Sequence, residues 1–108
     1  YNPEEAYRLY HTLSKYKYGW PEAQVKMAEY YTYELYGNDK ADWEKAKRYL
    51  EAASSLGSHD AAIFLKALTL AEEECIKVNG SLENTPKEQK SYRLAAAMET
   101  IRNEFWKI

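Results

Sequence analysis

The spacing of apolar residues between the few glycines and prolines is the feature that most constrains the fold of this chain. Four glycines and three prolines stand among 108 residues, and they fall where segments of helical spacing begin or end. Within each segment apolar side chains recur every three or four residues, and no segment keeps the period-two alternation of a strand. The pattern therefore predicts an all-α protein.

Five helices are expected from this spacing, in one domain that is long enough to bury a single core. Their expected ranges are 3–16, 21–36, 40–56, 58–78 and 86–106. The side chains expected on the five apolar faces are Ala6, Leu9, Tyr10 and Leu13; Ala23, Met27, Tyr31 and Leu35; Trp43, Ala46, Tyr49, Leu50 and Ala53; Ala61, Leu65, Leu68, Ala71 and Cys75; and Leu94, Met98, Ile101 and Phe105.

Capping residues stand at the ends of these segments. Asn2 and Thr85 each precede a proline, which predicts an N-cap oxygen followed by proline at the first helical position. Gly57 can adopt the left-handed conformation that ends a helix, and Ser58 can then cap the next one. These local signals agree with the boundaries that the apolar spacing predicts.

The helices also repeat along the chain. Ala61 follows Ala23 by 38 residues, and Ala46 follows Ala6 by 40 residues. A pair of helices repeated at this period is typical of α-solenoids. Around this repeat the sequence matches a known pattern at Ala23, Met27, Ala28 and Tyr31 in one helix and at Asp42, Lys45, Ala46, Tyr49, Ala53, Ser54 and Gly57 in the next.

At these positions the chain resembles the Sel-one-like repeat family, a branch of the tetratricopeptide-like solenoids. The resemblance implies a short α-solenoid of about five antiparallel helices, with residues 1–108 forming one repeat domain. Residues 1–20 would be half a repeat, 21–57 the best-matching repeat and 58–108 a divergent repeat. Its last helix either caps the final core layer or docks onto further chain.

Composition and motifs argue against several classes of function. The net charge is −2, and lysines and arginines alternate with acids instead of forming the basic face that nucleic-acid binding needs. No segment is long and apolar enough for membrane insertion. His11 and His59 lack a second ligand at metal-binding spacing on their own helices, and phosphate-binding and nucleophile motifs are missing. We therefore expect no enzyme site, no metal and no cofactor.

Two further features have simple structural interpretations. Cys75, the single cysteine, lies on an apolar helix face and is expected to be a buried thiol. The sequence Asn79-Gly80-Ser81 matches the pattern of a glycosylation site, but it also begins a polar, turn-rich stretch over residues 79–86. The turn is the favoured interpretation.

A non-catalytic protein–protein interaction module is the expected function, because solenoids bind partners through exposed side chains. The family resemblance implies an adaptor, a scaffold or an inhibitor of immunity type, often bacterial. The partner would be a protein or a peptide. Periplasm or cell envelope and cytoplasm both stay open as compartments. The alternative is a structural or self-association segment of a longer repeat protein, and a homo-oligomer joined through the first helix would support it.

The tyrosines suggest which surface would bind. Ten of the eleven lie within residues 1–49, and four fall in the stretch 28–37. Tyr31 is expected to be buried against the helix of Tyr49, and Tyr36 to pack the following turn. The residues expected to contact a partner lie on adjoining faces of the second helix and are Tyr30, Tyr33, Lys26 and Glu29. The alternative, that these rings fill gaps between helices, is equally open.

Overall fold

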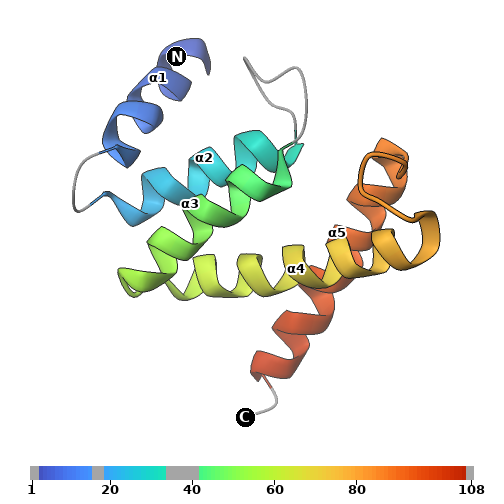
Figure 1. The fold of residues 1–108 in the computed structure, drawn as a ribbon. Coiled ribbons are helices and arrows are strands. Elements are labelled where there is room, and N and C mark those ends of the chain that lie inside the picture. Colours follow the sequence, from blue (N-terminus) through green and yellow to red (C-terminus); the bar gives the residue numbers. More distant parts are fainter. Residues whose placement is uncertain (1–2, 16–18, 34–41, 107–108) are drawn as a thin grey trace. The chain divides into compact units, whose positions relative to one another are not determined.

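The structure is a computed structural model that describes residues 3–15, 19–33 and 42–106 (Figure 1). These residues form five helices and no strand, so the predicted all-α fold is confirmed. The helices are α1 (Pro3–Ser14), α2 (Pro21–Tyr33), α3 (Trp43–Ser55), α4 (His59–Asn79) and α5 (Lys87–Trp106). The expected end of the second helix and start of the third lie outside the described residues, as do Asn2, Leu35 and Tyr36.

The chain divides into two compact units, Tyr1–Ala62 and Ile63–Ile108. The first holds α1, α2, α3 and the first turn of α4, and the second holds the rest of α4 with α5.

In the first unit, α3 and α1 both pack against α2 (Figure 1). Small side chains allow α2 and α3 to approach closely, and longer ones fill the space that remains. The fully buried residues of these two helices are Ala23, Met27 and Ala28 of α2 and Ala46, Leu50 and Ala53 of α3. The indole nitrogen of Trp43 also donates a hydrogen bond of 3.3 Å to the carbonyl of Thr32.

Two predicted helix ends are confirmed in this unit. Gly57 has a φ of +96°, the left-handed conformation expected after α3. The hydroxyl oxygen of Ser58 accepts a 3.1 Å hydrogen bond from the backbone N–H of Ala61 and so caps α4. A third cap is present at α3, where the carboxylate of Asp42 accepts a 3.0 Å bond from the N–H of Lys45.

The buried face of α1 differs from the prediction. Ala6 and Ser14 are buried, whereas Leu9 is 50% exposed. Ala6 and Ser14 are eight residues apart and lie on the same side of α1. The Ser14 hydroxyl can be buried because it donates a 2.8 Å hydrogen bond to the carbonyl of His11. The hydrophobic pattern alone predicted Leu9 on the buried face and did not predict Ser14 there.

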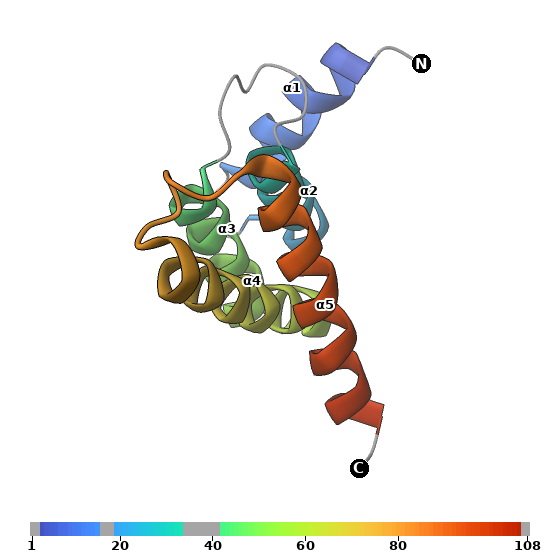
Figure 2. The same ribbon diagram turned by 90° about the vertical axis from the view of Figure 1, so that its right-hand side faces the viewer.

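In the second unit, α4 and α5 lie against each other (Figure 2). The buried apolar side chains of this unit are Phe64, Ala67, Leu68, Ala71, Cys75, Leu94, Ala97 and Ile101. Leu65 was predicted on the buried face of α4 but is only half-buried, because the buried positions advance from Phe64 to Leu68 with the ordinary helical spacing. The predicted burial of Cys75 is confirmed, and this burial raises the pKa of its thiol.

The loop between α4 and α5 is held by side chains. The amide of Asn79 donates a 3.3 Å bond to the hydroxyl of Thr85, which donates a 2.8 Å bond to the carbonyl of Ser81. The Thr85 side chain therefore makes its hydrogen bonds within the loop. Helix α5 begins at Lys87, one residue later than predicted, and the carbonyl of Pro86 accepts a 3.0 Å hydrogen bond from the N–H of Lys90. Engagement of the Asn79 amide favours the plain turn over a glycosylated asparagine.

The close approach of α2 and α3 makes a stability prediction. Ala46→Leu adds bulk at a position with no exposed surface, so we expect the free energy of unfolding to fall by about 1–3 kcal/mol. The matched control is Ala52→Leu on the exposed side of the same helix, with a change within about 0.5 kcal/mol. Urea denaturation of both variants measures this, and equal midpoints would mean that α3 does not pack through Ala46.

Candidate functional site

One face of α2 carries three of the four residues predicted to contact a partner. Lys26, Glu29 and Tyr33 follow Glu22 at helical spacing, and we call these four residues the exposed face of α2. The Nζ atom of Lys26 lies 3.2 Å from the Oε2 atom of Glu29, and the Tyr33 side chain is 43% exposed. The structure therefore brings Lys26, Glu29 and Tyr33 together on one accessible strip.

Tyr30 does not belong to this strip, and of the two interpretations left open for its ring the structure favours the one in which it fills a gap between helices. Its side chain is only 9% exposed. Its ring meets the ring of Tyr7 edge to face, with centroids 4.9 Å apart and planes at 79°. Because α1 packs against this side of α2, an aromatic that would otherwise face solvent becomes part of the core.

Tyr31 occupies the core position predicted for it. Its ring stacks on that of Tyr49 across the contact of α2 with α3, with centroids 5.9 Å apart and planes at 14°. The Nζ atom of Lys45 lies 4.8 Å from the centroid of the Tyr31 ring, and a hydrogen bond with Tyr31 raises the pKa of the Lys45 ammonium.

Tyr7 and His11 extend this aromatic cluster on α1. Their rings are stacked, with centroids 6.0 Å apart and planes at 7°. The pKa of Tyr7 is raised to about 12, mainly by burial and to a smaller extent by a hydrogen bond with Tyr31. Burial also lowers the pKa of His11, and the positive charges of Lys15 and Lys45 lower it further. Both groups are therefore held neutral near neutral pH.

A pocket of about 280 Å³ opens beside this cluster. The side chains that line it come from all three helices of the unit and are Ser14, Gln24, Lys45, Arg48, Tyr49 and Ala52. We call it the basic pocket, because the described residues of its lining include two cations and no carboxylate. Gln24 is 6% exposed, and its Oε1 atom has no hydrogen-bond partner among the described residues.

Sequence reasoning did not find the basic pocket. Lys45 and Arg48 stand in a stretch where bases and acids alternate, which is typical of solvated helix surface. The only signal was their spacing of three residues, which places them on one side of α3. The other walls come from Ser14 and Gln24 on different helices, and a pattern along one helix cannot reveal them.

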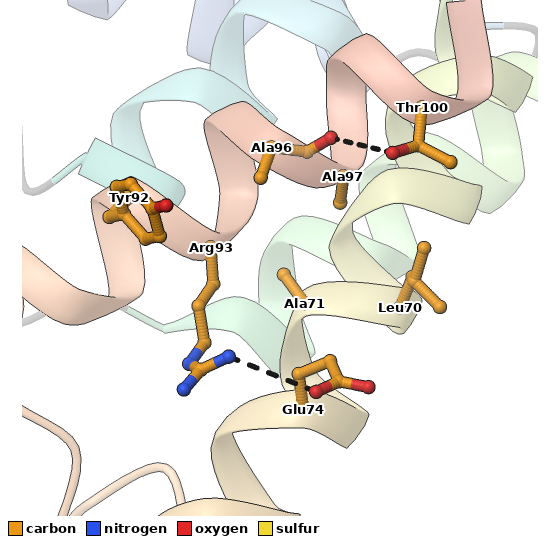
Figure 3. A pocket seen from close by; sticks show the side chains of 8 residues that line it. All are labelled: Leu70, Ala71, Glu74, Tyr92, Arg93, Ala96, Ala97 and Thr100. Carbon is orange, nitrogen blue, oxygen red and sulfur yellow. Dashed lines mark hydrogen bonds and ion pairs between the residues drawn. The ribbon is translucent and has the colours of Figure 1, made fainter.

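The second unit has a smaller pocket of about 200 Å³ between α4 and α5 (Figure 3). Its lining residues are Leu70, Ala71, Glu74, Tyr92, Arg93, Ala96, Ala97 and Thr100. Arg93 reaches across the pocket to within 3.8 Å of Glu74. The two charges compensate each other, so this lining offers mainly small apolar surface beside Tyr92, which is 73% exposed.

Neither a metal site nor a membrane span emerges from residues 3–15, 19–33 and 42–106. Within these ranges no three His, Cys, Asp or Glu residues gather closely enough to hold a metal ion, and no helix combines the length and apolarity needed to cross a bilayer. Comparison of the whole chain with protein-family models, with curated proteins and with solved structures gave no match. Function is therefore inferred from the geometry of the chain itself.

The burial of Tyr30 and the exposure of Tyr33 predict different effects of the same substitution. Tyr30→Ala removes a buried ring and should lower the free energy of unfolding by about 3 kcal/mol. Tyr33→Ala, one turn further along α2, should change it by no more than about 0.5 kcal/mol. Thermal and urea denaturation followed by circular dichroism compare the two, and equal losses would contradict the burial of Tyr30 by α1.

His11 should make stability depend on pH. Its folded pKa lies below the ordinary value of 6.5, so the folded state binds a proton less readily than the unfolded state. The stabilisation is then complete above pH 6.5 and is lost as the pH falls through the lowered value. We expect the urea midpoint to drop between pH 7 and 5. The drop should shrink in His11→Phe, which keeps a ring against Tyr7. A drop of the same size in both proteins would assign it to other groups.

Proposed function

We propose that the chain is a non-catalytic protein–protein interaction module with the architecture of a Sel-one-like, tetratricopeptide-like α-solenoid. In this proposal α2 and α3 are the antiparallel pair of one helical repeat. Support comes from the residues on which the resemblance rests, since Ala23, Met27, Ala28, Ala46 and Ala53 are all fully buried. These residues serve packing, which leaves the exposed side chains of the same helices for binding.

The observation that carries the proposal is the exposed face of α2. Tyr33 presents a large, stiff ring with a hydroxyl, the kind of side chain on which protein interfaces often depend. Beside it, Lys26 and Glu29 form an exposed ion pair, which contributes little to folding stability. Both charges can therefore exchange their mutual contact for contacts with a partner at small cost.

The partner proposed for this face is a protein or a peptide. In a solenoid of helical pairs the first helix of each repeat lines the concave surface, and α2 holds that place in the best-matching repeat, residues 21–57. An adaptor, a scaffold or an inhibitor of immunity type would each use such a surface. The shared requirement is a partner that covers Tyr33 and reaches the adjoining charges.

Exposed apolar side chains in residues 1–20 favour a second candidate, self-association within a longer repeat protein. Leu9 and Trp20 are 50% and 51% exposed, and repeat stacks need their ends covered. A homo-oligomer joined through α1 would cover Leu9. Sedimentation at rising protein concentration separates the two candidates, because only self-association makes the molecular mass depend on concentration.

The interaction proposal predicts that Tyr33→Ala loses a partner without losing the fold. A partner is first captured from the native source with the wild-type chain, and its affinity is then measured with purified proteins. We expect Tyr33→Ala to weaken binding at least about tenfold, the loss typical of a central interface tyrosine. The matched control is Tyr92→Ala, which removes an exposed tyrosine from the other unit and should bind as wild type does. Unchanged affinity in Tyr33→Ala would contradict a binding role for the exposed face of α2.

A further inference from the structure

The basic pocket gathers positive charge in a protein whose net charge is −2. Lys45 and Arg48 both line it. Lys15 contributes to the same region, since the charges of Lys15 and Lys45 together lower the pKa of His11. Bringing these cations near one another is unfavourable. An anion in the pocket would turn this repulsion into attraction.

Arg48 has no carboxylate partner among the residues described, whereas Lys45 has a hydrogen bond with Tyr31 and, more weakly, the charge of the Asp42 carboxylate to raise its pKa. Lys45 contacts the Tyr31 ring on one side. Arg48 is exposed, and no hydrogen bond or ion pair to it is found within the described ranges. A guanidinium presents paired N–H groups in a planar fork, the geometry that matches a carboxylate. The pocket therefore has a donor set suited to one carboxylate, with Arg48 as the principal contact.

Gln24 adds a second requirement. Its Oε1 atom is buried and accepts no hydrogen bond from the described part of the chain, and an unpaired buried acceptor is costly to a folded protein. Because Gln24 lines the pocket, a ligand N–H can supply the missing bond after the amide rotates about its terminal torsion, which is a soft one. The complementary ligand is a carboxylate with an N–H group close by.

The pocket has room for one side chain or for the end of a peptide chain. Its volume of about 280 Å³ is close to the lower end of the roughly 300–1,000 Å³ of typical ligand sites. An acidic side chain with its own backbone N–H fits this chemistry and this space. So does the last residue of a peptide, whose amide N–H precedes a terminal carboxylate.

We propose that the basic pocket binds a carboxylate of a peptide segment, with Arg48 and Lys45 holding the carboxylate and Gln24 accepting the neighbouring N–H. This rests on the proposed function, because the peptide would belong to the protein partner. It adds an acidic anchor to the aromatic contact at the exposed face of α2, which lies on the same compact unit.

Three labelled hexapeptides distinguish the sources of the carboxylate. The first alternates glutamate and glycine and has an amidated C-terminus. The second replaces every glutamate with glutamine, and the third is the second with a free C-terminal carboxylate. Fluorescence anisotropy should show binding of the first or the third, weakened by added salt because the contacts are charged. Binding of the second as tight as that of the other two would overturn the proposal.

Variants of the pocket complete the experiment. Arg48→Gln should lower the affinity for the peptide that binds by about tenfold, the loss expected when one charge-assisted hydrogen-bonding partner is removed. Lys45→Gln should weaken it in the same direction. The matched control is Lys66→Gln, which removes an exposed lysine from the second unit and should leave affinity unchanged. Equal affinities in Arg48→Gln and Lys66→Gln would contradict the pocket.

His11 offers a readout that reports the location of the carboxylate. A carboxylate beside Lys45 offsets the repulsion that Lys45 exerts on the imidazolium, so the His11 pKa measured by NMR should rise when the peptide binds. The amidated glutamine peptide should leave it unchanged. A constant His11 pKa with the bound acidic peptide would place the peptide elsewhere and overturn the proposal. Tighter binding of a single-stranded oligonucleotide, lost in Arg48→Gln, would replace the peptide with nucleic acid.

Failure of this inference and failure of the proposed function give different results. If the captured partner loses affinity for Tyr33→Ala but keeps it for Arg48→Gln, the interaction module stands and the pocket has no part in it. If the acidic peptide binds in an Arg48-dependent manner while Tyr33→Ala keeps full affinity for the partner, the inference about the pocket stands. The proposal that the exposed face of α2 binds the partner is then wrong.

Discussion

The close contact between α2 and α3 is the interaction on which the first unit depends. The alanines at positions 23, 28, 46 and 53 of these helices are fully buried, and the stacked rings of Tyr31 and Tyr49 join α2 to α3. The contact between the two helices also decides what lies at its edges. Lys45 is brought over the Tyr31 ring, and the residues of the basic pocket converge beside Tyr49. The candidate binding features are thus consequences of how the core is packed.

Features that depend on neighbours along the chain could be predicted from the sequence. Apolar spacing and sparse glycines located five helices, because both signals act within a few residues. The ends at Gly57 and Ser58 followed from backbone conformation and one side-chain hydrogen bond. Leu9 and Leu65 show where this reasoning stops, since several positions around a helix are apolar and only the packed neighbour decides which of them is buried.

The candidate site was harder to predict because its properties arise between helices. Tyr33 stayed accessible as expected, whereas Tyr30 became buried through Tyr7, a residue 23 positions earlier in the chain. The basic pocket combines Ser14, Gln24 and Arg48 from three helices, and none of them forms a motif with another in sequence. Side chains with ordinary local surroundings acquire a chemical role only when tertiary packing sets them beside one another.

The two candidate surfaces of the first unit would contribute differently to the proposed binding. Contact with the ring of Tyr33 buries apolar area and so favours affinity, but a flat aromatic contact discriminates poorly between partners. The charges at the exposed face of α2 already pair with each other, so they add little selection. No carboxylate is among the described residues that line the basic pocket, and a partner without an acid there would leave Arg48 desolvated and unpaired. Specificity would therefore arise mainly at the pocket. Leaving a charge buried and unpaired lowers the affinity for a wrong partner by more than one good contact raises the affinity for the right one.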